Sequence, residues 1–407
     1  MGVSVSKSTS NTNNTEFLSF ERRRVPRHLR PLKGKSIERQ LPRSDLEKQN
    51  SPCKDKISRA DKQHTSTSNS INTLIPHENF RRLDELEQIF MDHSTSGPQM
   101  FRWIKGRRFQ NSDDICYPLP NDQLEIDRQR VQLYIIRWAF ESRHVVPPPI
   151  KQKLNEGIRV LNVGCGPGLW VGHPIIDMAE DFCNSTFDAV DVCNLIPRCQ
   201  HSDRQTRSSN PLQQGPDNLK FSLHNILMEP LPYVSNIFDY VQQSITALAY
   251  RAEDWPNIVK ELSRVTKPGG YIQLIEIEMY PYCSGPLGES WWNEILETIR
   301  FERGNDPGVA TRLGDLLSDA DLEDVNVRFV SIPIGSWGLD IGNLWKQNVY
   351  AFLDSAATFL IQLLGITNSE YKKRTQKFTE ELDSGQYKAF SNIYVAYGRK
   401  KAITTDE

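Results

Sequence analysis

The chain has 407 residues, of which 38% are hydrophobic and 25% are charged, and its formal net charge is −2. This composition is ordinary for a globular protein, and the near-neutral balance argues against a dedicated nucleic-acid-binding protein. The seven cysteines lie at irregular spacings between Cys53 and Cys283. They predict free thiols in a reducing compartment and no metal site. No stretch is long and apolar enough to predict a membrane-spanning helix.

Residues 1–75 differ from the rest of the chain. They carry 15 Lys and Arg against 7 Asp and Glu and contain few aromatic residues, so we expect a disordered basic tail. The first six residues, Met-Gly-Val-Ser-Val-Ser, fit the pattern for myristoylation of Gly2.

One acyl chain binds a membrane only weakly, and a basic cluster in this tail is the kind of second signal that stable membrane anchoring requires. A solvated linker explains the cluster equally well. The cluster consists of Arg22–Arg24, Arg27, Arg30, Lys33 and Lys35. We expect a cytoplasmic protein, with the nucleus and the membrane surface as alternative locations.

Residues 76–150 predict a helical segment ahead of the main domain. Apolar residues recur at helical spacing from Phe80 to Phe90. Asn121 or Asp122 can cap a further helix, and Pro147–Pro149 are expected to end it. The apolar residues of this helix lie along one stripe, as in a helix packed on a core. The stripe consists of Leu124, Val131, Ile135 and Trp138.

From residue 151 to 407, short apolar runs alternate with helical segments, which predicts an α/β domain with a mostly parallel, doubly wound, Rossmann-like sheet. Two late strands, 325–332 and 391–397, are expected to close the sheet, the last one in an antiparallel sense. The earlier strands are expected at 158–163, 187–190, 219–223, 238–242 and 271–277.

The strongest local signal is a glycine-rich turn after the first of these strands. Gly164, Gly166 and Gly168 follow a buried run and precede a helix, and glycines there let the backbone approach a ligand closely. A nicotinamide dinucleotide loop has the spacing G-x-G-x-x-G, whereas the third glycine here comes one residue earlier. The spacing therefore disfavours NAD and suits S-adenosylmethionine.

An acidic residue follows the next strand, where the ribose of such a cofactor would lie. Asp191 ends the segment Phe187–Asp191, and its two carboxylate oxygens can accept hydrogen bonds from both ribose hydroxyls. The alternative is that Asp191 is a loop acid or a helix cap.

Several motifs in the same order resemble the class I S-adenosylmethionine-dependent methyltransferases. Leu161–Gly168 resembles the first motif of that family, Phe238–Gln243 its fourth-strand motif, and Val265–Tyr271 the turn before its fifth strand. More narrowly, Phe101–Phe109 and Leu119–Asp122 resemble a fungal branch that includes LaeA-like proteins. The resemblance to this branch begins at about residue 95. It implies insertions after about residue 280, on the side of the domain that binds the methyl acceptor.

The resemblance implies roles for particular residues. Asn225 and Ile226 would flank the adenine, Gln242 would line the floor of the cofactor site, and the N-terminal helical segment would cover the cofactor, with Tyr134 or Arg107 near it. Asn162 and Asn225 stand where many family members carry an acid, so we expect weaker electrostatic attraction for the cofactor.

No catalytic residue is assigned, because methyl transfer mainly requires positioning of the acceptor and exclusion of water. Four side chains lie near predicted strand ends or motif loops, and capping or surface roles are favoured for each of them. They are His173, His224, Asp254 and Glu276.

The methyl acceptor is expected to be a small molecule or a protein. Nucleic-acid bases are disfavoured, since the Asn-Pro-Pro-Tyr signature of enzymes that methylate them is absent after Gln242. Four tryptophans beyond the cofactor motifs either line an apolar acceptor cavity or fill a core, with the core favoured; they are Trp291, Trp292, Trp337 and Trp345. A rival hypothesis is a regulator that binds the cofactor without methyl transfer, and a second is a nucleotide-dependent oxidoreductase, which the glycine spacing opposes.

Overall fold

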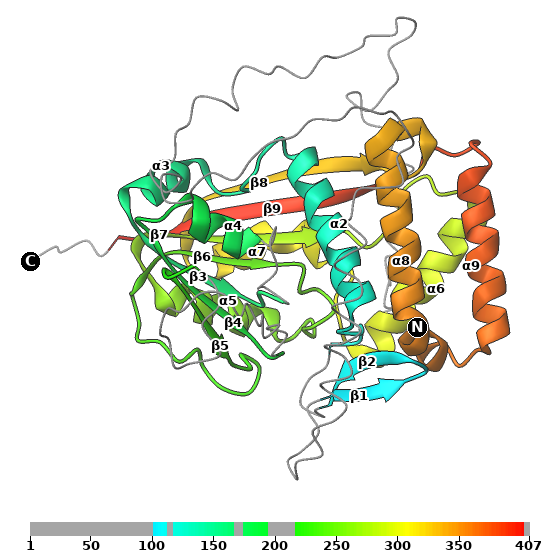
Figure 1. Ribbon diagram of the computed structural model, residues 1–407, viewed down its shortest axis with the longest axis horizontal. Coiled ribbons are helices and arrows are strands. Elements are labelled where there is room, and N and C mark those ends of the chain that lie inside the picture. The colour runs from blue at the N-terminus through cyan, green and yellow to red at the C-terminus, as the bar shows by residue number, and fades with distance from the viewer. Residues whose placement is uncertain (1–100, 112–116, 167–173, 194–215, 403–407) are drawn as a thin grey trace, which may run out of the picture.

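The computed structural model describes residues 101–111, 117–166, 174–193 and 216–402 (Figure 1). The predicted basic tail, with Gly2 and the arginine-rich cluster, lies outside these ranges, as does the helical pattern at Phe80–Phe90. In the described part of the chain, no helix combines the length and the apolar content needed to cross a membrane.

A seven-stranded sheet forms the centre of the described fold, with the strand order β5-β4-β3-β6-β7-β9-β8. The first five strands of this order run parallel, and β9 lies antiparallel between β7 and β8. The expected mostly parallel sheet with an antiparallel last strand is therefore confirmed. The strands are β3 (Arg159–Val163), β4 (Thr186–Asp191), β5 (Leu219–Leu223), β6 (Phe238–Ser244), β7 (Thr266–Ile277), β8 (Leu322–Pro333) and β9 (Phe390–Lys400).

Helices cover both faces of this sheet, because each buried strand presents apolar residues alternately to its two faces. In β3, Val160 packs with α3 and α4, whereas Leu161 and Val163 pack in the cluster that includes α5 and α7. The covering helices are α3 (Pro148–Glu156), α4 (Pro174–Asp181), α5 (Trp255–Val265) and α7 (Leu313–Asp319), the last preceded by the short helix η3 (Val309–Arg312).

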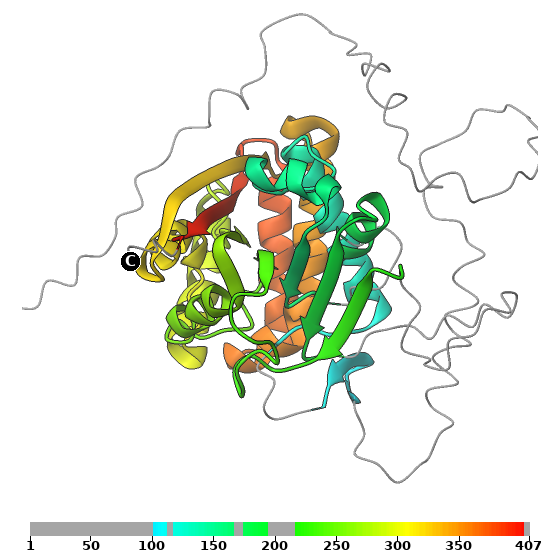
Figure 2. The ribbon, with the colours of Figure 1, turned by 90° about the vertical axis from the view of Figure 1, so that its left-hand side faces the viewer.

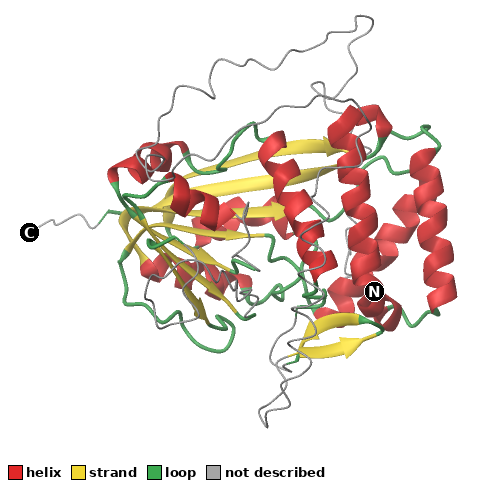
Figure 3. Cartoon of the chain, viewed as in Figure 1, coloured by secondary structure: helices red, strands yellow, loops and turns green. Residues whose placement is uncertain are grey.

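A second helical layer packs beside the β7, β8 and β9 end of the sheet. Figure 3 shows these helices grouped to one side of the strands. The layer shares one apolar cluster with α2, and this cluster includes Trp291, Trp292 and Trp345. Its helices are α6 (Pro286–Arg303), α8 (Leu339–Leu363) and α9 (Asn368–Asp383), with the short helix η4 (Ser336–Gly338) before α8. Figure 2, which turns the molecule by 90°, shows α8 and α9 behind the strands.

The segment before β3 contains both strands and helices. β1 (Phe101–Ile104) and β2 (Arg107–Gln110) form an antiparallel hairpin that the sequence did not predict, followed by α2 (Gln123–Ala139). The Asp122 carboxylate accepts a hydrogen bond from the backbone N–H of Glu125 at 3.1 Å and caps α2, as predicted. The expectation that Pro147–Pro149 end this helix is wrong: α2 ends at Ala139, and Pro148 is the first residue of α3. Proline suits that position because its missing N–H has no helical partner there.

The predicted apolar stripe of α2 is wrong in its orientation. Leu124, Val131 and Trp138 are exposed, and only Ile135 of the four is buried. The buried face instead carries Glu125, Arg128 and Gln132 beside Ile126, Ile135 and Ile136. The inward-facing polar groups indicate that α2 borders a site that is not purely apolar.

The thiols also differ in part from expectation. Cys165 and Cys193 have free thiols, whereas Cys183 is disulfide-bonded. Among the described residues, no group of three or more His, Cys, Asp or Glu side chains is arranged to hold a metal ion.

Candidate active site

The glycine turn follows β3 at the carboxyl edge of the sheet. Gly164 and Gly166 have φ values of +66° and +64°, in the left-handed region that favours glycine. A Cβ on Gly164 would lie 3.1 Å from Cγ2 of Thr246. The N–H groups of Gly164 and Cys165 both donate to the carbonyl of Val190, at 2.9 and 3.2 Å. The turn is therefore fixed against β4, and its glycines leave room beside the backbone. Gly168 lies outside the described residues.

Asp191, at the end of β4, fixes the other side of this turn. Its Oδ2 accepts a hydrogen bond from the N–H of Gly166 at 2.7 Å, and its Oδ1 accepts one from the N–H of Cys193 at 2.9 Å. Burial raises the pKa of the Asp191 carboxyl, and these N–H groups counteract part of that effect. Each carboxylate oxygen can accept a second hydrogen bond, so both oxygens retain capacity for ligand hydroxyls.

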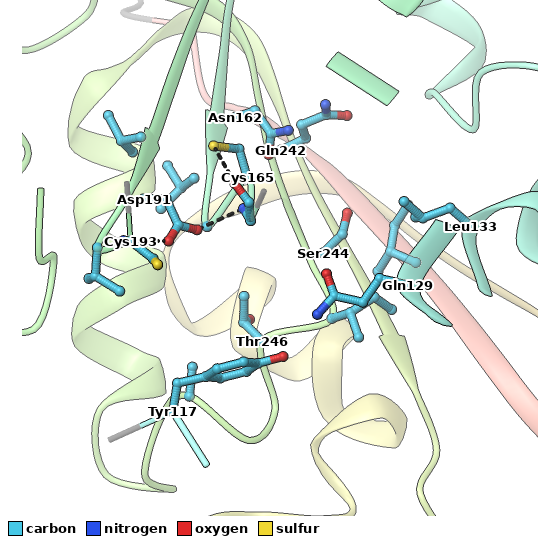
Figure 4. A pocket seen from close by; sticks show the side chains of 18 of the residues that line it. Tyr117, Gln129, Leu133, Asn162, Cys165, Asp191, Cys193, Gln242, Ser244 and Thr246 are labelled. Carbon is cyan, nitrogen blue, oxygen red and sulfur yellow. Dashed lines mark hydrogen bonds between the residues drawn. The ribbon is translucent and has the colours of Figure 1, made fainter. Parts of the chain in front are cut away.

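These residues line a cavity of about 250 Å³ at the carboxyl ends of β3, β4 and β6, which we call the first cavity (Figure 4). Ligands of open α/β sheets bind at this edge. The structure brings together around it six of the seven residues predicted to bind the cofactor, namely Gly164, Gly166, Asp191, Asn225, Ile226 and Gln242.

Two amide side chains at the first cavity, Asn225 and Gln242, are engaged in local hydrogen bonds. Oδ1 of Asn225 accepts from the N–H of Leu227 at 3.1 Å, which holds the loop after β5. Gln242 is almost fully buried, and its Oε1 accepts from the hydroxyl of Tyr240 at 3.1 Å. Asn162 is also buried and lines the cavity. A neutral amide therefore occupies the position at which many class I methyltransferases carry an acid.

Helix α2 forms the opposite wall of the first cavity. Its lining side chains include Glu125, Arg128, Gln129 and Gln132, and Figure 4 shows Gln129 directed toward Ser244 of β6. The N-terminal segment thus covers this cavity, as the resemblance implied. Tyr134 is 60% exposed, and neither it nor Arg107 lines the cavity. Arg107 instead pairs with Asp122 at 2.5 Å.

An ion pair is buried in this wall. Arg128 donates to both oxygens of Glu125, at 2.6 and 2.8 Å, and the two side chains are 5% and 1% exposed. The guanidinium also donates to Oε1 of Gln132 at 2.7 Å and to Oδ1 of Asn348 in α8 at 3.3 Å. Burial lowers the pKa of Arg128, but the hydrogen bonds and the charge of Glu125 raise it by more. The hydrogen bond to Asn348 ties this pair in α2 to the second helical layer.

A second cavity of about 100 Å³ adjoins the first. Both are lined by Tyr117, Leu119, Arg128, Gln132 and Ile245, so the two cavities share a wall. The second cavity reaches into the helical layer, where it is lined by Met279, Trp292, Ile334, Trp345, Val349 and Phe352.

The tryptophans therefore have mixed roles. Trp292 and Trp345 belong to the core cluster and also line the second cavity. Trp291 belongs to the core without lining either cavity. Trp337 is half-buried, and its indole N–H donates to the carbonyls of Ile334 and Ala389. The favoured core role is thus confirmed for Trp291, Trp292 and Trp345, and the last two also line a cavity.

A strained turn separates the two cavities. Ile245 has a φ of +57°, which is unusual for a β-branched residue and persists only where its surroundings hold it. The N–H of Ile245 donates to the carbonyl of Ile275 at 2.8 Å.

Glu276 holds the next two residues of this turn. Its carboxylate accepts from the N–H and the hydroxyl of Thr246 at 2.6 and 3.0 Å, and from the N–H of Ala247 at 3.3 Å. Burial raises the pKa of Glu276 to about 7, against the effect of these donors.

The other polar candidates have ordinary surroundings. His224 lines the first cavity, and its Nε2 lies 3.0 Å from the carbonyl oxygen of Glu229. Asp254 accepts a hydrogen bond from the N–H of Arg251 at the start of α5. His173 lies outside the described residues.

Sequence reasoning did not identify the particular side chains of α2, and of the residues before it, that line the first cavity. Glu125, Arg128, Gln129 and Gln132 recur at the helical spacing of one face, and this polar stripe was the available signal. A polar stripe ordinarily faces solvent, which is why the apolar stripe was placed inside instead. Tyr117 precedes the helix, and no pattern in the sequence marked it.

The chain has recognisable relatives, although no family model matches it. It is 24% identical over 317 residues to the secondary metabolism regulator LAE1 of Cochliobolus heterostrophus, covering 74% of this chain and 93% of that protein. It is 22% identical over 321 residues to the methyltransferase pytC of Aspergillus terreus, covering 75% and 90%. With the protein-methionine methyltransferase laeA of Emericella nidulans it shares 21% identity over 258 residues, covering 61% and 62%.

These relationships agree with the geometry of the molecule. The matched regions extend well beyond the glycine turn, and the sheet carries the expected parallel strands with an antiparallel last strand. The chain is thus similar over about three quarters of its length to a LaeA-like regulator and to a methyltransferase, in agreement with the resemblance to class I S-adenosylmethionine-dependent methyltransferases.

Proposed function

We propose that the chain transfers a methyl group from S-adenosylmethionine to a small-molecule or protein acceptor. The observation that carries this proposal is the convergence of three strand ends on one cavity. The glycine turn after β3, Asp191 after β4 and Asn225 after β5 all line the first cavity, and the second cavity adjoins it.

The residues present fit the cofactor. Gly164 and Gly166 leave the backbone open to a ligand, and we assign the shape of the cradle to them and to Gly168. Asp191 is assigned to the ribose hydroxyls, Asn225 and Ile226 to the adenine, and Gln242 to the floor.

The bound cofactor supplies a methyl group already activated on a sulfonium, so the chain's task is positioning. Helix α2 and the turn at Ile245 line both cavities. Holding two reactants in a fixed, dry geometry accounts for much of the catalysis of such displacements.

Titration of the full-length chain with S-adenosylmethionine and S-adenosylhomocysteine tests this proposal. We expect Asp191→Ala to weaken binding at least tenfold, a change of about 1.4 kcal/mol, because it removes the ribose acceptor and releases the N–H of Gly166. Asp188→Ala is the matched control: Asp188 lies on the same strand and pairs with Arg159, away from the cavity. Equal effects of the two substitutions would contradict the assignment of Asp191, and absence of binding by the folded chain would contradict the proposed function.

The names of the relatives bear on the acceptor and the role. One is called a regulator and another a protein-methionine methyltransferase, so a regulatory protein that methylates a protein acceptor is included in the proposal. Turnover with protein and small-molecule acceptors separates it from the rival hypothesis of a cofactor-binding regulator, which predicts tight cofactor binding without product.

Membrane contact through Gly2 is a further part of the proposal. The sequence pattern at Gly2 and the nearby basic cluster support it, and the cytoplasm and nucleus are the alternative locations. Mass spectrometry of the N-terminus of the chain from a fungal host tests it, and an unmodified Gly2 would remove it.

A further inference from the structure

The outer face of helix α2 carries apolar side chains that remain uncovered in the described part of the chain. Leu124, Tyr134 and Trp138 are 68%, 60% and 43% exposed, and the ring centroids of Tyr134 and Trp138 lie 6.1 Å apart. Val131 is also exposed. These four residues, which we call the outer stripe, follow one another at intervals of seven, three and four positions. They therefore lie along one face of the helix.

An uncovered stripe of this kind indicates a binding partner. Single apolar side chains are common on protein surfaces, whereas groups of adjacent apolar side chains mark interaction sites. The opposite face of α2 lines the first cavity and packs against α8, where Nδ2 of Asn348 donates to the carbonyl of Arg128 at 2.8 Å. A partner can therefore bind the outer stripe without displacing these contacts.

The sequence before the described fold contains a segment that also requires an apolar partner. Residues 80–90 lie outside the described ranges, and their apolar residues recur at the spacing of a helix. These residues are Phe80, Leu83, Leu86, Ile89 and Phe90. A helix this short is only marginally stable in water by itself. The segment can therefore be helical only if its apolar face packs on another part of the protein, and the outer stripe offers an apolar face.

The connection between this segment and α2 is short. The β1–β2 hairpin is attached to the start of α2, because the N–H of Asn121 donates to the carbonyl of Arg108 at 2.8 Å and its side-chain amide donates to Oε1 of Gln110 at 3.4 Å. Phe101 pairs with Gln110 in this hairpin, and only residues 91–100 separate it from the segment. A connection of this length spans at most about 35 Å. Helix α2 has 17 residues and is about 25 Å long, so the segment can reach the whole of the outer stripe.

We propose that residues 80–90 form a helix whose apolar face packs against the outer stripe of α2. The covalent connection favours this occupant over a second copy of the chain, because a partner on a short linker acts at a local concentration on the order of millimolar. A second copy or a membrane surface would cover the outer stripe but would leave the apolar face of residues 80–90 without a partner. Docking of the segment covers both apolar faces at once.

Hydrogen–deuterium exchange of the full-length chain, measured by mass spectrometry on peptides that cover residues 80–90, tests this docking. We expect these amides to exchange at least about tenfold more slowly than the intrinsic rates of the same sequence, because a docked helix protects its backbone N–H groups.

Three variants locate the contact. Tyr134→Glu places a charge within the outer stripe and should return the exchange of residues 80–90 to near the intrinsic rates, whereas Tyr134→Phe should keep the protection. Phe301→Glu is the matched control, since Phe301 is an exposed apolar residue on another helix, α6, and it should also keep the protection. Thermal unfolding followed by circular dichroism checks that each variant is folded.

Several results would overturn the proposal. They are exchange of residues 80–90 at the intrinsic rates in the wild-type chain, protection that survives in Tyr134→Glu, and protection that is lost equally in Phe301→Glu. Protection that depends on protein concentration, together with a dimer in sedimentation experiments, would assign the outer stripe to a second copy instead. Protection that arises only on vesicles of phosphatidylcholine and phosphatidylserine would assign the stripe to a membrane surface.

Discussion

Replacing Glu276 with glutamine should change how the stability of the protein depends on pH. Burial raises the pKa of Glu276 to about 7 from the ordinary value of 4.5, so the folded state holds this proton over a range in which the unfolded state has released it. The stability contributed by the group is complete below pH 4.5 and is lost as the pH rises through 7. The difference between the two pKa values corresponds to about 3 kcal/mol.

The hydrogen bonds of Glu276 indicate how the glutamine variant should behave. In the variant, the oxygen at the Oε1 position can still accept from the N–H and hydroxyl of Thr246. Only the N–H of Ala247, which donates to Oε2 at 3.3 Å in the wild type, then lies beside an NH2 group that cannot accept its hydrogen bond. The amide side chain of the variant therefore resembles the protonated acid. We expect Glu276→Gln to be slightly less stable than the wild type near pH 4 and more stable at pH 8.

Urea denaturation of both proteins between pH 4 and pH 8 measures this change. The free energy of unfolding of the wild type minus that of the variant should fall by about 3 kcal/mol across the range. Glu253→Gln, which removes a largely exposed carboxylate, controls for the change in net charge. Parallel curves for the wild type and Glu276→Gln would refute the reasoning, because they would show that Glu276 ionises alike in the folded and unfolded chain.

Three further substitutions test other parts of the site. Arg128→Gln should lower the free energy of unfolding by about 3–5 kcal/mol, because it leaves Glu125 buried without its counter-charge. Adding Glu125→Gln should restore part of the lost stability. A loss of less than about 1 kcal/mol for Arg128→Gln in denaturant titrations would contradict the buried pair. Asp122→Ala should cost at least about 1–2 kcal/mol, because it removes both the cap of α2 and the carboxylate that pairs with Arg107. Asp122→Asn should retain most of the cap and lose the ion pair, so its loss in the same assay should be smaller. Gly166→Ala should lower the free energy of unfolding by about 1–2 kcal/mol, since the φ of +64° disfavours alanine, and calorimetry should show weaker cofactor binding. Unchanged affinity and stability would show that the turn tolerates a side chain.

The sheet was largely predictable because its signals are local. Val160, Leu161 and Val163 lie in a mostly apolar run, as expected for a strand covered on both faces. Gly164 and Gly166 mark the turn because few other residues adopt its backbone angles. The order of such segments along the chain then indicated the fold class and the edge of the sheet at which Asp191 lies.

Helix α2 shows where local signals mislead. Its sequence contains an apolar stripe and a polar stripe, and burial usually follows the apolar one. Here Glu125 and Arg128 face inward because they satisfy each other and border a cavity, while Leu124 and Trp138 remain exposed. Departures from the usual pattern concentrate at functional sites, so the exception is informative once the structure is known.

The full lining of the second cavity could not be predicted from the sequence, which gave a cavity at the tryptophans only as one alternative. Its walls combine Tyr117, Trp292, Trp345 and Ser391, which lie far apart along the chain, and their proximity depends on how the helical layer packs on the sheet. The strain at Ile245 is likewise invisible in the sequence, since no glycine marks that turn.

Arg128 borders both cavities, and this position links their occupants thermodynamically. A ligand in one cavity that shifts the guanidinium alters the affinity of the other cavity, and the two effects must be equal in size, because coupling free energies are reciprocal. Under the proposed function, occupation of one cavity therefore acts on the other through a single side chain.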